Sequence, residues 1–450
     1  MGWSKPAGPD RISCMSQETL STLQFGEPSL VERSLSDNVR GLIGSEILKI
    51  AASIREMIAA GEQVCNLTVG DFDTAQFPIP ARLLEHIQQA YLDGETNYPP
   101  ADGVLELRNA LCEYAAREWG ARYPVESVLI ASGARPLLYG AYRCVVNPGD
   151  KVVYSVPSWN NNHYVWMSGA EGVAVPTRSE DGFMPTLDQL APHLKEARAI
   201  CLNSPLNPAG TVIRENQLRA ITEAIVEENE RRTRAGKRHL FLIHDQVYSA
   251  LVFDSNRHHM PVALVPEAAP WVISLDGISK CFASTGLRLG WVFAAPELTR
   301  RMKSLIGHIG AWAPRPVQVA LARFLAEPEA VREFQSEMNR RVQARLNALY
   351  TGFEQLREQG YPVECVKPQG AIYLSLRLDL IGKTVGGVRI DSNEQIRRLL
   401  LDRAGMAVVP FQAFGLDEES GWFRISVGAV SMAEIERCLP RVRQLLDERG

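Results

Sequence analysis

The sequence has no hydrophobic run long enough to cross a membrane and no charged-then-apolar leader after Met1, so neither membrane insertion nor secretion is expected. It also has no excess of basic charge. The 48 lysines and arginines stand against 52 aspartates and glutamates, which gives a net charge of -4. The densest basic cluster, Arg231 to Arg238, follows a glutamate-rich segment, and we interpret it as a solvated helix end and loop. Nucleic acid is therefore not an expected partner.

Cysteine is sparse, with eight residues scattered over 450 positions. None lies close to another, and no spacing matches a metal site, so neither a disulfide framework nor a metal is expected. Several lie within apolar runs, which is typical of reduced core cysteines in a cytoplasmic protein. The eight are Cys14, Cys65, Cys112, Cys144, Cys201, Cys281, Cys365 and Cys438.

The length of 450 residues, 46% of them hydrophobic, predicts a large core and two domains. Residues 1–40 are polar and weakly periodic, which favours an N-terminal arm or extension. Residues 41–86 include a helical pattern after Ser45, with Ile47, Ile50 and Ile54 on one face, and are expected to join a small domain. Residues 87–327 are expected to form the large domain. Residues 328–450 begin with a long helical segment near Pro328 and are expected to complete a small α+β domain.

Short apolar runs alternate with helical segments in the large domain. Connections of this length predict an α/β fold with a mainly parallel sheet, and runs that are apolar throughout indicate strands covered on both faces. The seven predicted strands are Ser127–Ile130, Lys151–Tyr154, Gly172–Val175, Ala199–Asn203, His239–His244, Trp271–Leu275 and Trp291–Ala294. Ligands of such sheets bind at the carboxyl ends of the strands.

The segment from Ile278 to Trp291 follows one of these strands and carries the most specific chemistry. Lys280 stands directly after the apolar run, and Arg288 follows it between glycines. Burial and a nearby cation lower the pKa of an amine and free it to attack an aldehyde, while a planar guanidinium holds a phosphate. An aldehyde with a phosphate tail is pyridoxal phosphate, so the pair suggests a Schiff base between that cofactor and Lys280.

Five other motifs complete the pattern, and most of them stand just after a predicted strand. Each by itself also has an ordinary structural explanation: a β-to-α turn, a core tryptophan, a turn dipeptide, an aspartate that caps a helix, and a surface arginine. They are Ser132–Leu137, Val156–Trp159, Asn203–Gly210, His244–Tyr248 and Trp422–Ser426. With the lysine segment, the six motifs in this order resemble the class I/II aminotransferases of fold type I, the aspartate aminotransferase superfamily. The resemblance covers roughly residues 40–445.

The resemblance implies a large domain with a mainly parallel seven-stranded sheet, a smaller α+β domain, and pyridoxal 5'-phosphate as cofactor. It implies that Lys280 forms the Schiff base, that Asp245 pairs with the protonated pyridine nitrogen, and that Tyr248 bonds the phenolic oxygen and lowers the pKa of the imine. The phosphate is expected at Ala134, Arg135, Ser279 and Arg288, while Trp159 stacks on the ring and Asn207 bonds the phenolic oxygen.

Substrate contacts are implied as well. Arg424 is expected to grip the α-carboxylate of the amino acid, with Gly70 and Asn207 beside it. Tyr98 is expected to reach the phosphate of a neighbouring subunit, which implies a homodimer with shared active sites. The segment Gly307 to Arg315 is a further candidate to contribute across that interface.

The sequence departs from the family at three positions. Gly277 stands where many relatives have serine, Gln246 where they often have glutamate, and Phe411 where they have glycine. The first predicts that one phosphate hydrogen bond is absent or supplied elsewhere, and the third puts the local backbone and the substrate pocket in question.

The expected reaction is transfer of the amino group of an L-amino acid to a 2-oxo acid, with freed Lys280 moving the proton at Cα. Two alternatives stay open at this point. Elimination, cyclisation or oxidation of an amino acid uses the same cofactor contacts, and a binding protein or regulator that has lost the chemistry keeps the same fold. The side chain of the substrate is not specified by these motifs.

Overall fold

The structure is a computed structural model that describes residue 23, residues 25–42, residue 44 and residues 46–449. The chain divides into two compact units, residues 1–43 and residues 44–450. Cys14, Ser45 and the first 22 residues of the predicted N-terminal extension lie outside the described residues.

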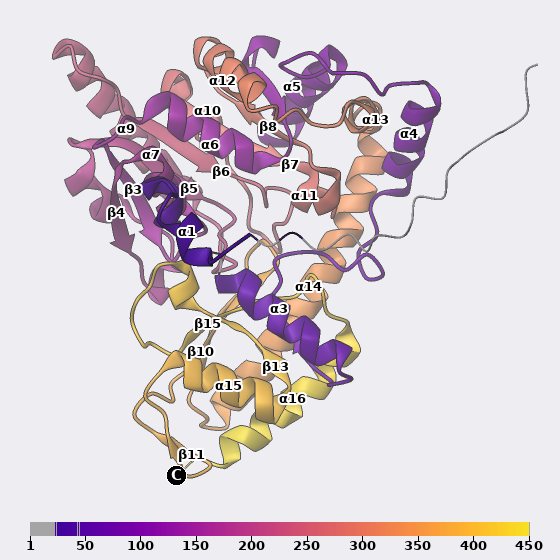
Figure 1. Ribbon diagram of the computed structural model, residues 1–450, viewed down its shortest axis with the longest axis vertical. Helices are drawn as coiled ribbons and strands as arrows, with labels where there is room; N and C mark the ends of the chain where they lie inside the picture. The colour runs from indigo at the N-terminus through magenta and orange to yellow at the C-terminus, as the bar shows by residue number, and fades with distance from the viewer. Residues whose placement is uncertain (1–22, 24, 43, 45, 450) are drawn as a thin grey trace, which may run out of the picture. The chain divides into compact units, whose positions relative to one another are not determined.

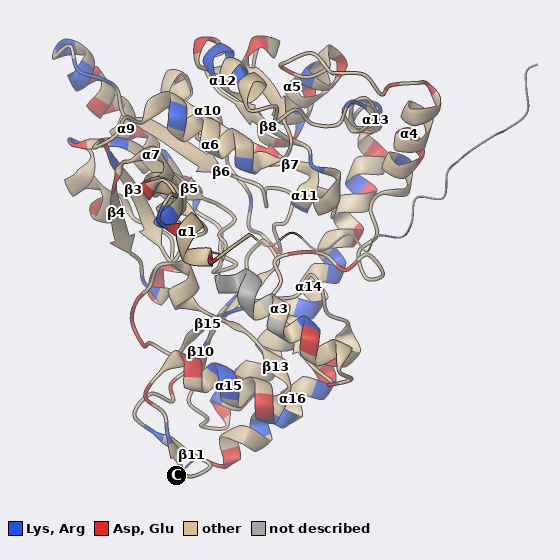
Figure 2. Ribbon diagram, viewed as in Figure 1, with Lys and Arg blue, Asp and Glu red and all other residues tan. Residues whose placement is uncertain are grey.

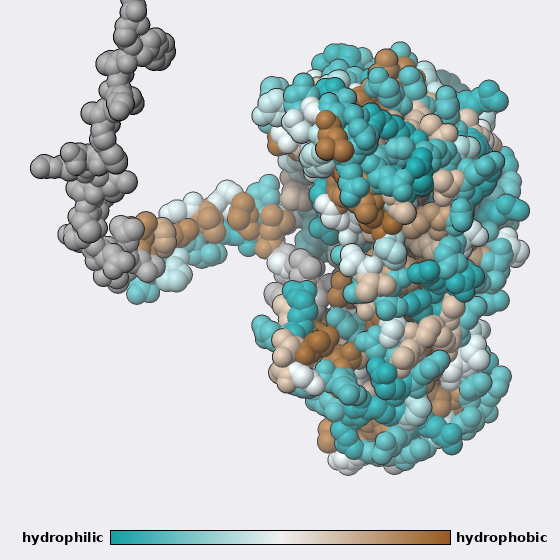
Figure 3. Space-filling view, turned by 90° about the vertical axis from the view of Figure 1, so that its right-hand side faces the viewer, coloured by the Kyte–Doolittle hydropathy of each residue, from teal (hydrophilic) through white to brown (hydrophobic). Residues whose placement is uncertain are grey.

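The N-terminal unit contains two short helices, α1 (Pro28–Glu32) and α2 (Asp37–Arg40), and neither has a buried residue. The Ser36 side chain caps α2 by accepting a hydrogen bond from the backbone N–H of Val39. Large apolar side chains stand exposed along this segment and appear brown in Figure 3; they are Leu23, Phe25, Leu30, Val31, Val39 and Leu42. The described part of this unit therefore has no core of its own.

A seven-stranded sheet forms the centre of the second unit (Figure 1). Its strands lie in the order β2-β8-β7-β6-β5-β3-β4, and β8 alone among them runs antiparallel to its neighbours. They are β2 (Val128–Ala131), β3 (Lys151–Val156), β4 (Glu171–Pro176), β5 (Ala197–Asn203), β6 (Phe241–Asp245), β7 (Val272–Gly277) and β8 (Gly290–Phe293). The prediction of a mainly parallel seven-stranded sheet is confirmed. The edge strand β4 differs from the expected apolar run because most of its residues are partly or fully exposed.

Helices cover both faces of this sheet. Alternate strand residues such as Ile243 and Ile273 pack with α6 and α12 on one face, and Leu242 and Val272 pack with α9 on the other. The helices of this region are α4 (Ala81–Leu92), α5 (Leu105–Trp119), α6 (Ala134–Val145), α7 (Asn161–Ser168), α8 (Leu187–Leu190), α9 (Glu215–Arg234), α10 (Pro261–Leu264), α11 (Ile278–Cys281), α12 (Pro296–His308) and α13 (Arg315–Leu325). Burial on both faces explains why the central strands lack the alternation of a half-exposed sheet.

A second, antiparallel sheet of order β14-β15-β10-β9 lies toward the end that carries the C-terminus in Figure 1. Its strands are β9 (Val363–Val366), β10 (Tyr373–Leu378), β14 (Val409–Pro410) and β15 (Trp422–Ser426), and the remaining short strands are β1 (Cys65–Asn66), β11 (Thr384–Val385), β12 (Val388–Arg389) and β13 (Met406–Ala407). The helices are α3 (Glu46–Ala59), α14 (Pro328–Glu358), α15 (Asn393–Ala404) and α16 (Met432–Asp447).

The long helix predicted near Pro328 is confirmed as α14. It continues to Glu358, and strands and helices alternate only from β9 onward. The reason is that Leu346, Leu349 and Phe353 keep helical spacing and are fully buried. The domain boundaries at residues 86 and 327 stay predictions.

Charges of both signs alternate along the exposed helices in Figure 2. Many of them pair one helical turn apart, as Arg300 does with Glu297, Arg340 with Glu337 and Arg357 with Glu354. Exposed pairs of this kind add little to stability, because water and salt screen them. The faces of the helices that carry these pairs are therefore solvent-exposed surface.

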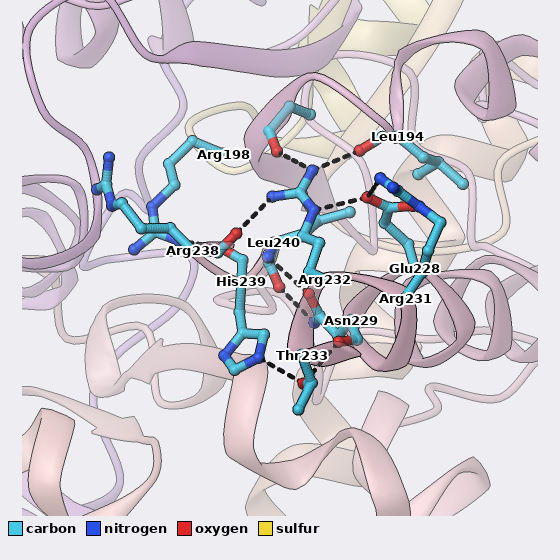
Figure 4. Close-up of polar contacts among 11 residues, drawn as sticks. Leu194, Arg198, Glu228, Asn229, Arg231, Arg232, Thr233, Arg238, His239 and Leu240 are labelled. Atoms are coloured by element: carbon cyan, nitrogen blue, oxygen red, sulfur yellow. Dashed lines mark hydrogen bonds and ion pairs between the residues drawn. The ribbon is translucent and has the colours of Figure 1, made fainter. Parts of the chain in front are cut away.

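The basic cluster at the end of α9 differs from this pattern, and the prediction of a solvated helix end and loop is wrong for Arg232. Arg232 is buried and donates hydrogen bonds to Glu228 and to the carbonyl oxygens of Leu194, Ala197 and Arg238 (Figure 4). The guanidinium thus satisfies carbonyls around strand β5, and it anchors the helix end to the sheet.

Replacing Arg232 by alanine is expected to lower the free energy of unfolding by about 3 kcal/mol, since it leaves buried carbonyls and part of the Glu228 charge without a donor. Arg234→Ala is the matched control, because that side chain is 73% exposed and its pair with Glu230 is 3.9 Å long. It is expected to change stability by less than about 0.5 kcal/mol. Urea unfolding of both variants measures the difference, and equal effects would contradict the anchoring role.

Candidate active site

A cavity of about 440 Å³ lies where β5, β6 and β7 end. Asn203, Asp245 and Leu275 occupy adjacent register positions of these strands, and all three line the cavity. Of the predicted site residues, the cavity is lined by Gly70, Ala134, Arg135, Trp159, Asn207, Asp245, Tyr248, Ser279, Lys280, Arg288 and Arg424. Segments more than 300 residues apart in the sequence therefore meet at one place.

Lys280 extends into the cavity from α11, the short helix that follows β7. Its Nζ donates a hydrogen bond to the carbonyl oxygen of Gly70 and lies 5.7 Å and 5.9 Å from the ring centres of Phe72 and Tyr248. Burial lowers the pKa of the amine from 10.5 to about 8; Asp71 opposes this shift, and the guanidinium of Arg424 adds to it. A large fraction of the amine is therefore neutral and nucleophilic near pH 8.

Covalent modification of Lys280 by an aldehyde should follow this titration. We expect the rate to rise with pH through a midpoint near 8 and to level off about one unit above it, because only the neutral amine attacks. The test treats cofactor-free protein briefly with pyridoxal, traps the product with borohydride and quantifies the modified peptide by mass spectrometry. A midpoint near 10.5, the ordinary lysine value, would contradict the environment described here.

Asp245 ends β6 and forms no ion pair with any residue that the structure describes. The backbone N–H of Val247 donates to its Oδ1 at 3.2 Å, and a turn rather than a helix follows, so Asp245 does not cap a helix. Burial raises the pKa of the carboxyl to about 6, while the hydrogen bond from Val247 opposes the shift. A buried carboxylate that forms no ion pair with the described residues fits a protonated ring nitrogen.

Arg424 on β15 is a buried cation without a carboxylate partner among the described residues, the counterpart of Asp245. The side chain is 1% exposed. Its Nη1 donates a hydrogen bond to Oδ1 of Asn207 at 3.2 Å, and its Nη2 donates to the carbonyl oxygen of Thr68. Its Nε has no hydrogen-bond partner among the described residues. The guanidinium lies 4.8 Å from the ring centre of Tyr373 and 4.9 Å from that of Phe414. A buried cation with a free donor fits a carboxylate ligand.

A third part of the cavity suits a phosphate. Helix α6 begins at Ala134 after Gly133, whose φ of 91° few other residues adopt without strain. A Cβ at position 133 would come within 2.5 Å of Nη2 of Arg288, so glycine lets this guanidinium approach the helix start. Free N–H groups, the helix dipole and the cation together favour an anion here, and Ser279 lines the same cavity.

Aromatic groups form the walls between these three parts. Trp159 lies with its ring 5.5 Å from the guanidinium carbon of Arg135, and Tyr248 is buried with its hydroxyl bonded to that of Tyr373. A flat conjugated ligand would fit against the indole face. Tyr98 behaves differently, since it is 82% exposed, packs edge-on against Trp312 and does not line the cavity of its own chain.

The three departures from the family pattern have structural explanations. A Cβ at position 277 would lie 2.9 Å from the carbonyl oxygen of Leu289, so this backbone leaves little room for serine. Gln246 is buried, faces Asp276 and does not line the cavity. Phe411 begins a short 3-10 turn and has no positive φ, so the backbone here does not require glycine. Its ring packs edge-on against Phe183.

The motifs assigned no function to several cavity residues. Arg55 from α3, Asp71, Tyr164 and Tyr373 all line the cavity. Asp71 directly follows Gly70, a predicted substrate contact, and that position was the available signal for it. Nothing in the spacing of α3 distinguishes Arg55 from a surface residue.

Comparison with known proteins agrees with this geometry. Residues 62–442 match the family "Aminotransferase class I and II". The chain belongs to this family. It is 31% identical over 413 residues to an aspartate aminotransferase of Rhizobium meliloti (strain 1021), covering 90% of this chain and 94% of that one. An aspartate/prephenate aminotransferase of Cereibacter sphaeroides is 30% identical over 410 residues, covering 90% and 96%.

Solved structures of family members have the same fold. Aspartate aminotransferase from Rhizobium meliloti superposes with a TM-score of 0.82 at 28% identity and covers 92% of this chain and 99% of that chain. The Thermus thermophilus enzyme with maleate gives 0.81 at 26% identity, with 91% and 99% covered. The protein is thus a fold type I aminotransferase that depends on pyridoxal 5'-phosphate. Within the described part of the chain, Asp245 and Arg424 have no ion-pair partner, and the pKa of Lys280 is lowered; the three groups fit that cofactor and an amino acid.

Proposed function

We propose that Lys280, Asp245 and Tyr248 carry out amino transfer in this cavity and that the amino donor is an acidic L-amino acid, aspartate first. The observation that carries the assignment of roles is the convergence of three groups in one cavity. Among the described residues, one is a buried cation without an anionic partner, one is a carboxylate without a cationic partner, and one is an amine with a lowered pKa. Each of these groups is costly alone, and together they match one ligand pair.

The cofactor would be held by Ala134, Arg135, Ser279 and Arg288 at its phosphate, by Trp159 at the ring face and by Asp245 at the ring nitrogen. Asn207 and Tyr248 would bond its phenolic oxygen. When bound, it supplies an aldehyde carbon that captures the amino group and a conjugated ring that accepts electrons.

The chain's own residues then divide the remaining work. Arg424 binds the α-carboxylate and thereby fixes which bond of Cα faces Lys280. The amine of Lys280, with its pKa lowered to about 8, removes the proton from Cα and holds it for return. Gly70, whose carbonyl accepts from Lys280, leaves space beside Arg424 for the substrate.

The choice of an acidic donor rests on the relatives rather than on the charge of the cavity. Its lining includes the cations Arg55, Arg135, Lys280, Arg288 and Arg424 but only the acids Asp71 and Asp245. A dianionic phosphate and one carboxylate balance this net positive charge, so the lining does not by itself require a second carboxylate. The aspartate aminotransferases among the relatives carry the choice of an acidic donor.

The test uses the full chain loaded with pyridoxal phosphate. L-Aspartate should discharge the visible absorption of the cofactor, and a 2-oxo acid should restore it; L-asparagine, which has the same shape without the charge, should react at least about 10²-fold less efficiently. Equal catalytic efficiency with the two amino acids would contradict the proposal of an acidic donor. Ammonia release without an oxo-acid acceptor would instead favour a lyase.

The Arg424→Lys variant is expected to lose about 10²–10³-fold in kcat/KM for the amino acid, because an ammonium cannot replace the two-pronged contact and leaves Asn207 and Thr68 unsatisfied. Steady-state kinetics measure the loss. Arg377→Lys on the paired strand β10 is the control, since that guanidinium pairs with Glu364 outside the cavity. A loss below tenfold in Arg424→Lys would remove it from the carboxylate site.

We also propose that the protein is a cytoplasmic homodimer with shared sites. The exposure of Tyr98 and the open position of Arg288 support a contribution from a neighbouring subunit. None of the described helices has the length and apolar character needed to span a bilayer. Sedimentation should give about twice 49.9 kDa, and a monomer that retains full activity would refute the shared site.

A further inference from the structure

Tyr373 stands at the start of β10, where two strands of the small sheet bring it beside Arg424. In the antiparallel pair, Tyr373 lies opposite Ser426 and Ser375 lies opposite Arg424. Residues two apart on a strand share a face, so Tyr373 and Arg424 are diagonal neighbours on one face. The guanidinium carbon of Arg424 accordingly lies 4.8 Å from the ring centre of Tyr373.

The hydroxyl of Tyr373 makes a second contact. It forms a hydrogen bond with the hydroxyl of Tyr248, and the two rings meet edge-on at 5.4 Å. Both tyrosines are at least 96% buried, with 1% and 4% of their surface exposed. Water therefore has little access to the pair, and each hydroxyl depends on the other.

The backbone around Tyr373 holds this position tightly. A Cβ at Gly70 would come within 2.7 Å of the Tyr373 hydroxyl, and a Cβ at Gly210 would come within 2.0 Å of the Tyr373 carbonyl oxygen. Both glycines belong to segments that line the site, and Gly70 also accepts the hydrogen bond from Lys280. Glycine at both positions is what lets Tyr373 approach the reacting groups.

We propose that Tyr373 is a positioning residue that links the two halves of the site: its hydroxyl orients the hydroxyl of Tyr248, and its ring orients the guanidinium of Arg424. The inference rests on the proposed roles of Tyr248 and Arg424. No other described residue contacts both groups through its side chain in this way. The charged groups that face the hydroxyl pair are Arg424 from β15, Asp245 from β6, Lys280 from α11 and Asp71 from the segment after β1.

Two variants separate the two contacts. Tyr373→Phe keeps the ring and removes the hydroxyl, so Tyr248 should bond the cofactor less well. The pH midpoint of the visible absorption of the loaded protein should then rise by about 0.5–1 unit, in the same direction as in Tyr248→Phe. The dissociation constant of maleate, a dicarboxylate probe for Arg424, should change less than about twofold.

Tyr373→Leu removes the ring as well, and the dissociation constant of maleate should rise about tenfold. If this variant does not fold, Tyr373→Met provides the same comparison. An unchanged absorption midpoint in Tyr373→Phe overturns the role of the hydroxyl, and unchanged maleate affinity in Tyr373→Leu or Tyr373→Met overturns the role of the ring. A wild-type protein that shows neither a pH-dependent visible band nor maleate binding would refute the proposed function itself, so the two failures are distinguishable.

Discussion

Lys280→Ala is expected to abolish amino transfer, with kcat lower by at least about 10⁴-fold. Two contributions are lost together: the amine that captures the cofactor aldehyde and the base that moves the proton at Cα. The structure supports both, because the Nζ projects into the cavity and its pKa is lowered to about 8. Single-turnover kinetics with L-aspartate measure the loss.

The controls for this variant separate charge from chemistry. Lys280→Arg keeps a cation but cannot form the covalent bond, so it should be as inactive as the alanine variant. Lys383→Ala removes a lysine that pairs with Asp379 on the surface, and its activity should equal that of the wild type. Turnover above a tenth of the wild-type rate in Lys280→Ala would mean that another group is the base.

Asp245→Asn is expected to lower kcat by about 10²–10³-fold while the protein stays folded. Asparagine has the same shape, and its carbonyl can still accept the hydrogen bond from the N–H of Val247. It lacks the negative charge that would hold the ring nitrogen protonated, so the ring withdraws electrons less strongly. Kinetics combined with thermal unfolding distinguish lost chemistry from lost structure.

Asp245→Glu provides the matched comparison, since it restores the charge at a displaced position. It should recover part of the activity that asparagine loses. A rate for Asp245→Asn within threefold of the wild type would show that the carboxylate does not face the cofactor, whatever its position at the end of β6.

Most strands of the large sheet were predictable from the sequence because they are buried on both faces and are apolar over most of their length; the edge strand β4 is the exception. The predicted ends of the strands were less accurate. Strand β6 was expected at His239–His244 but lies at Phe241–Asp245, which places Asp245 inside the strand. Arg232 shows another limit, because a buried arginine and a solvated one have the same local sequence, and only the carbonyls around β5 distinguish them.

The parts of the site that follow parallel strands were also predictable, since such ends converge at one edge of a sheet. Asn207, Asp245 and Lys280 meet in the cavity for that reason. The role of Tyr373 was not predictable, because it depends on the antiparallel register of β10 with β15 and on close approach by two glycines. The contribution of Tyr98 depends on a second subunit and stays a prediction.

Borohydride reduction of the protein loaded with pyridoxal phosphate, followed by peptide mass mapping, tests the central assignment most directly. We expect a visible absorption before reduction and a single peptide, the one that contains Lys280, carrying the cofactor after it; Lys280→Ala should carry none. Protein without a visible chromophore, or with the cofactor fixed to a different lysine, would contradict the account.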